Sequence, residues 1–91
     1  MDLMKGKKGL IMGVANERSI AWGISQKLAE AGAELAFTYL GEALKKRVIP
    51  LAEKLNSKVT FSCDVEEKEE IIKLFEDIKS KWGHIDFVVH A

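Results

Sequence analysis

A glycine and a serine that flank a short polar stretch are the residues whose types and spacing most directly suggest a chemistry. Gly13 follows the apolar run 9–12, and Ser19 precedes an amphipathic segment that begins at Ile20. A glycine allows the backbone to turn tightly and to approach a ligand closely. A helix N-terminus offers unpaired N–H groups and a partial positive charge. A strand that enters a helix in this way is typical of turns that bind the diphosphate of a nucleotide.

The same residues have a purely structural alternative. The fingerprint G-x-G-x-x-G is absent, because the motif here is Gly13, five residues, and then Ser19-x-Ala21-x-Gly23. A single glycine after a strand often forms only a tight turn, and Ser19 could be an N-cap whose hydroxyl accepts from the first-turn amides. Capping and phosphate binding are compatible, since a capped helix still has free N–H groups.

Two further strand ends could contact the rest of a dinucleotide. The second strand ends in the run 38–41 (Thr-Tyr-Leu-Gly), without the acid that often binds an adenosine ribose. The basic run 45–47 could approach a 2′-phosphate or could simply be solvated, so these residues leave NAD against NADP open. After the third strand, Asp64 could accept the adenine amino group while Val65 flanks the ring. Alternatively, Asp64 only caps the next helix.

Other reactive side chains do not form a recognisable constellation. His84 and His90 have no partners at metal-ligand spacing, and no nucleophile has a nearby base. Tyr39 is the only tyrosine, and the two tryptophans fit helix packing better than stacking on nucleic acid. The sequence therefore predicts neither a metal site nor a catalytic residue within these 91 residues.

The elements that would position the candidate residues alternate between strand and helix. Apolar periodicity predicts strands at 8–12, 34–39, 58–63 and 85–90, and helices at 19–31, 42–55 and 65–82. The first helix is expected to bury Ile20, Ile24, Leu28 and Ala31. Pro50 is expected to kink or break the second helix near 47–49, and Asp64 with Glu67 has the spacing of a capping box for the third.

This alternation predicts an α/β fold with right-handed crossovers and a parallel sheet. We expect the first half of a Rossmann-like doubly wound sheet, in strand order 3-2-1-4, with its ligand crevice at Gly13 and His90–Ala91. The apolar strand 85–90 would leave one edge unpaired, which soluble proteins usually cover. We therefore expect residues 1–91 to be the N-terminal part of a single NAD(P)-binding domain; an independent 91-residue domain is the weaker alternative.

Composition narrows the class of protein. The chain is 47% hydrophobic and 31% charged, which is ordinary for a soluble globular protein. Fourteen basic residues balance fourteen acidic ones, so charge gives no case for nucleic acid or an anionic membrane. No apolar run approaches the roughly 20 residues that span a bilayer, and the N-terminus lacks the apolar region of a signal peptide. A single cysteine, Cys63, fits a reducing cytoplasm.

Taken together, several of these segments resemble the bacterial enoyl-[acyl-carrier-protein] reductases, a divergent branch of the short-chain dehydrogenase/reductases. The segments are Gly13-Val14-Ala15 with Ser19-Ile20-Ala21-x-Gly23, the run 32–39, Cys63-Asp64-Val65, and Asp86-x-Val88-Val89-His90-Ala91. The longer connection between the glycine and the helix is the feature that separates these reductases from ordinary short-chain dehydrogenases.

The resemblance implies a role for each candidate residue in binding a dinucleotide. The pyrophosphate would lie over Gly13 and Ala15 and against Ser19 and Ile20. Leu40 would line the adenosine ribose, Asp64 and Val65 would bind the adenine, and Ala91 would begin the loop beside the nicotinamide ribose. Relatives often carry a polar residue at the position of Leu40, and NADP-preferring relatives place basic residues directly after the tyrosine. NADH is therefore favoured, and NADPH is not excluded.

The reaction that the resemblance implies is hydride transfer from NADH to the β-carbon of a trans-2-enoyl thioester on acyl carrier protein, in fatty-acid synthesis. The family acts as a homotetramer, and its catalytic Tyr-x6-Lys pair lies farther along the sequence than these residues. We expect this chain to supply the cofactor-binding part and to be inactive alone. The alternatives are a non-catalytic nucleotide-binding module and a related short-chain reductase that acts on a carbonyl.

Overall fold

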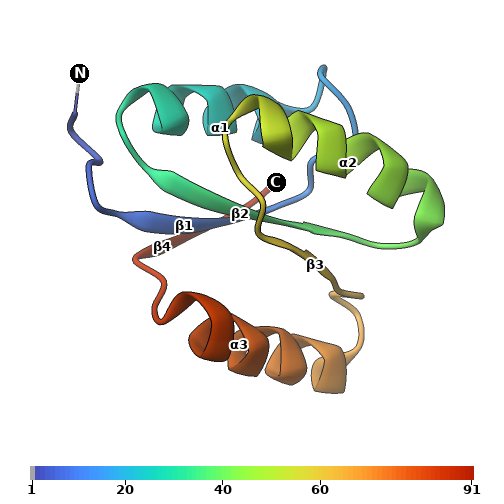
Figure 1. Ribbon diagram of the computed structural model, residues 1–91. Coiled ribbons are helices and arrows are strands. Elements are labelled where there is room, and N and C mark those ends of the chain that lie inside the picture. Colours follow the sequence, from blue (N-terminus) through green and yellow to red (C-terminus); the bar gives the residue numbers. More distant parts are fainter. Residues whose placement is uncertain (1) are drawn as a thin grey trace.

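A four-stranded parallel sheet forms the centre of the computed structural model, which describes residues 2–91 (Figure 1). In chain order the elements are β1 (Lys8–Met12), α1 (Ile20–Glu30), β2 (Glu34–Tyr39), α2 (Glu42–Lys54), β3 (Thr60–Ser62), α3 (Lys68–Trp82) and β4 (Phe87–His90). The strand order is β3-β2-β1-β4, and every pair of neighbours is parallel. The predicted α/β fold, Rossmann-like, and its 3-2-1-4 order are confirmed.

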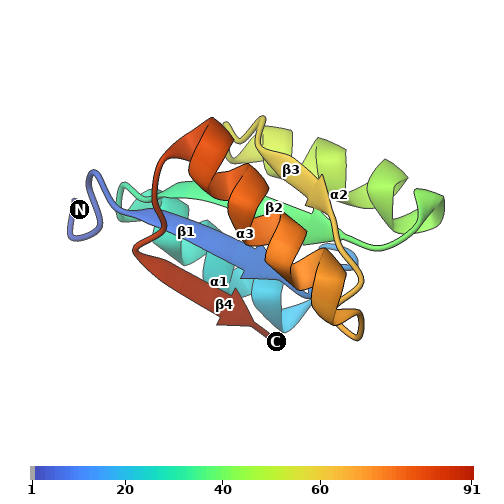
Figure 2. The same cartoon turned by 90° about the horizontal axis from the view of Figure 1, so that it is seen from below.

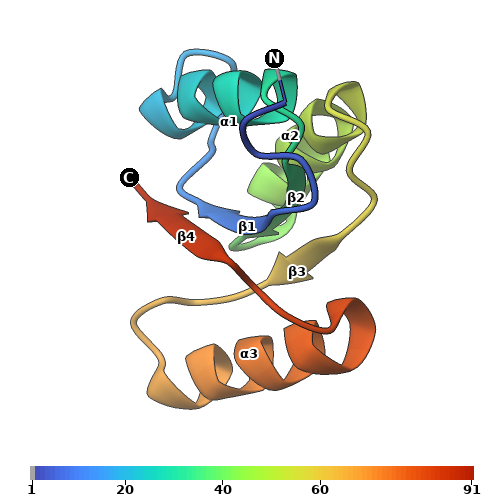
Figure 3. The same ribbon diagram turned by 90° about the vertical axis from the view of Figure 1, so that its left-hand side faces the viewer.

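The helices cover the two faces of the sheet unequally. Helices α1 and α2 lie on one face and α3 on the other (Figures 1 and 3). Seen from below, α3 crosses the sheet alone (Figure 2). Leu10 packs into the cluster with Leu74 and Ile78 of α3, whereas its neighbour Ile11 packs with Trp22 of α1. Side chains of successive strand residues point to opposite faces, so a strand buried on both faces reads as one continuous apolar run.

The buried side of α1 differs from the predicted one. Ile20 is 77% exposed and Ile24 is 37% exposed, whereas Ala21, Trp22 and Ser25 are buried. The hydroxyl of Ser25 donates to the carbonyl of Ala21 at 2.7 Å, so this polar side chain is satisfied inside the core. The expectation that the isoleucines face the sheet was therefore wrong, and small side chains face it together with a single tryptophan.

The sequence predicted a kink or a break in α2 at Pro50, and the helix is not broken there. The helix continues from Glu42 to Lys54 with the proline inside it. Pro50 is exposed, whereas Val48, Leu51 and Ala52 on the opposite side are buried. The backbone carbonyl that loses its partner to a proline on the solvent side can bind water instead.

The start of α3 also differs from the prediction. The helix begins at Lys68 rather than near Val65, and its N-cap, Glu67, makes no side-chain capping bond. Asp64 instead accepts the N–H of Glu66 on Oδ1 at 2.9 Å, in a turn that precedes the helix. An aspartate whose carboxylate closes a local turn competes with its use as a helix cap, so the predicted capping box does not form.

A small polar network joins β1 to β4 at the amino edge of the sheet, opposite the ends at which the strands finish. The Asp86 carboxylate accepts the Lys8 backbone N–H at 2.8 Å and pairs with His84 Nε2 at 3.2 Å. The Lys8 ammonium donates to the carbonyl of Trp82 at 2.7 Å. The start of β4 and the end of α3 are thus both bonded to the first residue of β1.

This network predicts a loss of stability in acid. The hydrogen bond from the Lys8 backbone lowers the pKa of Asp86, and the nearby His84 and Lys7 charges lower it further. A carboxylate whose pKa is lower in the folded state stabilises the fold above its unfolded pKa, and that contribution disappears as the pH falls through the folded pKa. Asp86→Asn should therefore flatten the acid limb of stability below the ordinary aspartate pKa of 3.8, measured by urea unfolding at a series of pH values. An unchanged acid limb would contradict this role.

Candidate functional site

The residues singled out from the sequence all lie at the carboxyl edge of the sheet or at the start of α1. Parallel strands finish at the same edge, and the register pairs Met12 of β1 with His90 of β4, and Tyr39 of β2 with Ser62 of β3. The candidate residues follow directly on these strand ends or open α1: Gly13, Ala15, Ser19, Ile20, Leu40, Asp64, Val65 and Ala91. In open α/β sheets this edge is where ligands bind.

Gly13 directly follows β1 and lies beside Ala91, which directly follows β4. Its φ of +103° lies in the region that favours glycine, and a Cβ at this position would collide with the backbone carbonyl oxygen of Ala91. The N–H of Ala91 donates to the carbonyl of Met12 at 3.3 Å, which holds the two strand ends together. A side chain at position 13 would therefore displace Ala91 or distort the turn that follows β1.

The hydroxyl of Ser19 bonds back to the turn between β1 and α1, and not forward to the helix as the capping alternative had it. The Ser19 hydroxyl accepts the backbone N–H of Ala15 at 2.9 Å and that of Asn16 at 3.0 Å, and it makes no bond to a first-turn amide. Its backbone carbonyl accepts the N–H of Trp22 at 3.1 Å, as an N-cap residue does. Both acceptor positions of the hydroxyl are occupied, so it can still donate its proton to an external acceptor.

Two residues that sequence reasoning missed fix the shape of this turn. Val14 is 3% exposed and belongs to the core cluster under α1 and α2, so it anchors the turn to the fold. The Asn16 side-chain carbonyl accepts the Arg18 N–H at 2.7 Å, and its backbone carbonyl accepts the Ser19 N–H at 3.1 Å. The signal for Asn16 was its residue type, because asparagine often bonds the backbone two residues ahead.

The first turn of α1 keeps unpaired donors. Among the described residues, the N–H groups of Ile20 and Ala21 have no hydrogen-bond partner, as expected for the first residues of a helix. No acidic side chain occupies this first turn, so nothing from the helix itself offsets its positive end. Helix geometry and electrostatics at this end therefore favour an anion.

The other half of the edge is formed by the ends of β2 and β3. The N–H of Cys63 donates to the carbonyl of Tyr39 at 2.9 Å, which places the residues that follow them, Leu40 and Asp64, near one another. Leu40 is 52% exposed and Val65 is 41% exposed. The Asp64 carboxylate has one oxygen bonded to the backbone N–H of Glu66, and the other oxygen is free to accept.

Cys63 lies beside this surface without joining it. The thiol is 3% exposed, and burial raises its pKa, with further raising from the charges of Glu70 and Asp64. The thiolate is the reactive form of cysteine, so Cys63 is neutral and inert at neutral pH. Within residues 2–91, no three His, Cys, Asp or Glu side chains are placed to hold a metal ion. Over the same residues, no helix has the length and apolar character needed to cross a membrane.

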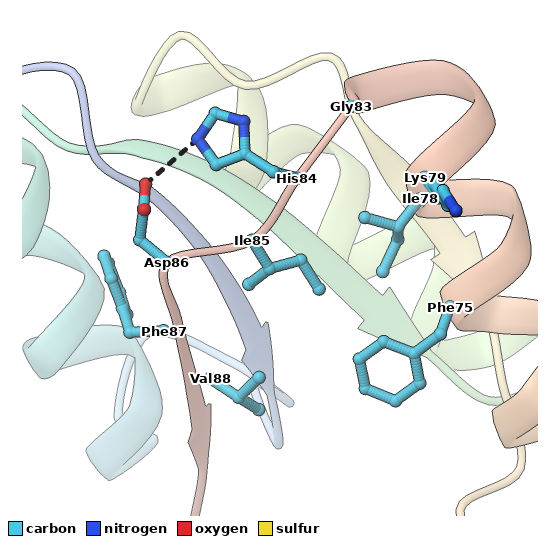
Figure 4. Close-up of a pocket in the computed structure, with 9 residues that line it drawn as sticks. All are labelled: Phe75, Ile78, Lys79, Gly83, His84, Ile85, Asp86, Phe87 and Val88. Carbon is cyan, nitrogen blue, oxygen red and sulfur yellow. Dashed lines mark ion pairs between the residues drawn. The ribbon is translucent and has the colours of Figure 1, made fainter.

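A groove of about 410 Å³ between α3 and β4 is a separate feature (Figure 4). Apolar side chains such as Phe75, Ile78 and Val88 line it, and the ion pair of His84 with Asp86 lies at its rim. None of the candidate residues at the carboxyl edge lines this groove. Its lining is mainly apolar, and the His84 ring at its rim is paired with Asp86, so it is a weaker candidate for a nucleotide site than the carboxyl edge.

Comparison with known proteins gives consistent matches over this whole stretch. Residues 13–91 match the family model described as enoyl-(acyl carrier protein) reductase. The chain is 61% identical over 89 residues to "Enoyl-[acyl-carrier-protein] reductase [NADH] 2" of Rhizobium meliloti (strain 1021), covering 98% of this chain and 33% of that protein. It spans about a third of the length of the curated relatives it matches.

Solved structures agree with the sequence matches. The reductase of Anaplasma phagocytophilum, crystallised in complex with NAD, is 53% identical and superposes with a TM-score of 0.90, covering 96% of this chain and 33% of that one. FabI from Candidatus Liberibacter asiaticus is 52% identical with a TM-score of 0.95, covering 99% of this chain and 35% of that one.

Proposed function

We propose, from the premise that this chain belongs to the enoyl-(acyl carrier protein) reductase family, that it supplies the cofactor-binding part of an NADH-dependent enoyl reductase. Residues 1–91 would be the N-terminal part of a single NAD(P)-binding Rossmann domain. The observation that carries the proposal is the Gly13–Ser19 turn, which brings a free hydroxyl proton and two unpaired helix amides to the carboxyl edge of the sheet.

The pyrophosphate would be held by the turn and the start of α1. Gly13 is exposed and has no side chain, so its backbone can be approached closely, and Ala15 adds only a methyl group to the turn. Ser19 would donate its hydroxyl proton to a phosphate oxygen, since its acceptor positions are already used. The N–H of Ile20 would add a helix-dipole donor.

The adenosine would lie over the ends of β2 and β3. Asp64 would accept the adenine amino group on its free carboxylate oxygen, and Val65 would cover the ring. Leu40 would line the ribose without offering it a hydrogen bond, and no basic side chain follows directly after Tyr39. This lack of a partner for a 2′-phosphate supports NADH over NADPH. Ala91, bonded to Met12, would begin the wall beside the nicotinamide ribose.

When bound, NADH would supply the hydride for reduction of a trans-2-enoyl thioester on acyl carrier protein. No residue of this chain is assigned to that step: the only tyrosine, Tyr39, ends β2 and is half-buried under the adenosine side of the edge. The chain alone should bind the dinucleotide without reducing a substrate. The family resemblance further supports a homotetramer that works in fatty-acid synthesis in the cytoplasm.

Calorimetric titration of the protein encoded by the complete gene, with NADH and NADPH in turn, tests this function. We expect NADH to bind and NADPH to bind more weakly, because its extra phosphate would meet Leu40 rather than a cation. Tighter binding of NADPH would overturn the cofactor preference. Absence of binding for both dinucleotides would overturn the function itself.

A further inference from the structure

We propose that Asn16 is a positioning residue of the nucleotide site: its side-chain carbonyl sets the shape of the turn that orients Ser19 and the start of α1. This inference rests on the proposed function, because it concerns how well the turn holds a pyrophosphate. Asn16 itself is not assigned any contact with the ligand.

Three polar groups of Asn16 hold the turn closed. Its Oδ1 accepts the Arg18 N–H at 2.7 Å, its N–H donates to Ser19 Oγ at 3.0 Å, and its carbonyl accepts the Ser19 N–H at 3.1 Å. The last two bonds use backbone atoms of Asn16, so a substitution leaves those atoms in place, but both bonds need the turn to keep its shape. The first depends on the side chain, and it is the shortest of the three.

The bond from Oδ1 restrains the residues that precede the N-cap. Asn16, Glu17 and Arg18 are all exposed, so no core contact keeps this part of the turn in place. Val14 anchors only the opposite end of the turn. Without Oδ1, the Arg18 N–H would turn to water, and the Asn16 N–H would no longer be held against Ser19 Oγ. A hydroxyl that loses one of its two donors is free to rotate, and its proton then no longer has a single direction.

A loosened turn should weaken ligand binding much more than it weakens the fold. The bonds involved are local and solvent-exposed, so their loss removes no core contact and hardly alters stability. Binding would have to order the turn again, and this ordering reduces affinity. The effect should be confined to the step that takes up the dinucleotide.

The test compares Asn16→Ala with Asn16→Ser in the protein encoded by the complete gene. A serine can accept a backbone N–H two residues ahead in the same way, although more weakly, whereas alanine cannot. We expect Asn16→Ala to raise both the calorimetric Kd and the KM for NADH by about five- to tenfold, the size of effect expected for one hydrogen bond. The kcat and the thermal midpoint should stay unchanged, and Asn16→Ser should restore most of the affinity.

Gln26→Ala is the matched control, because it also removes an exposed carboxamide, but from the middle of α1 and away from the turn. Its Kd should equal that of the wild type. Equal NADH affinity of wild type and Asn16→Ala, failure of Asn16→Ser to restore binding, or a fall in kcat together with the thermal midpoint would each overturn the positioning role. If the wild type itself does not bind NADH, the proposed function fails instead.

Discussion

Gly13→Val is expected to abolish NADH binding, for two reasons that act at the same place. Position 13 has a φ of +103°, which a β-branched residue adopts only with strain. A Cβ there would also collide with the Ala91 carbonyl, so the ends of β1 and β4 would have to move apart. Either the strained backbone or the displaced strand ends would distort the turn that is proposed to hold the pyrophosphate. We expect no measurable heat of NADH binding in calorimetry, with circular dichroism showing whether the sheet persists.

Gly23→Ala is the matched control for this substitution. Gly23 lies inside α1, and a Cβ at this position would meet no atom within 4 Å. Alanine favours a helix over glycine by about 0.5–1 kcal/mol, so this variant should be slightly more stable and bind NADH as the wild type does. Unchanged NADH affinity in Gly13→Val would refute the assignment of Gly13 to the site.

Phe37→Ala should produce the largest loss of stability. Phe37 is fully buried at the centre of β2, in the cluster between the sheet and the helices α1 and α2. Its strand pairs with β1 at Ile11 and with β3 at Thr60, and the cavity would open between the sheet and the two helices. Truncation of a buried phenylalanine costs about 3–5 kcal/mol. That loss is comparable with the whole stability of many small domains, so urea unfolding should show a much lower midpoint.

Phe75→Ala removes the same side chain from an exposed position. Phe75 is 42% exposed on α3, so less apolar surface is lost and no closed cavity forms. We expect a change in the free energy of unfolding of about 1 kcal/mol or less. If the two phenylalanine variants lost equal stability, the division into a buried and an exposed aromatic position would be wrong.

The sequence was sufficient to predict the strands and their order, because apolar runs, turn residues and intervening helices all indicate the same sheet. The bounds of β1 and β2 agree with the apolar runs, and each run ends at a turn signal. The parallel order followed from strands separated by helices, since such crossovers constrain the topology strongly. The outer strands were predicted too long: β3 retains only Thr60–Ser62, and β4 begins at Phe87. An outer strand has one neighbour, so its pairing ends where that neighbour diverges rather than where the apolar run ends.

The directions in which side chains point were harder to predict from the sequence than the bounds of the helices and strands. The spacing of Ile20 and Ile24 is that of a helix face, yet the face toward the sheet carries small residues around Trp22. A helix can approach the sheet closely when the residues that face it are small. Apolar periodicity reflects the hydrophobicity of a helix face and does not show how closely that face can pack. For Ser19 only the alternative of side-chain capping was wrong, because residue type indicates a cap but does not show whether the hydroxyl points to the helix or back to the turn.

The buried side chain of Val14 has a thermodynamic consequence for any ligand at the carboxyl edge. Because this residue is buried in the core, much of the conformational entropy of residues 13–15, the anchored end of the turn, is lost when the chain folds and not when a ligand binds. This end of the turn would therefore already have its bound conformation before a ligand arrives. Binding would then cost less conformational entropy, which favours higher affinity. Amide hydrogen exchange of the anchored end of the turn should then be slow in the free protein and should change little when NADH is added.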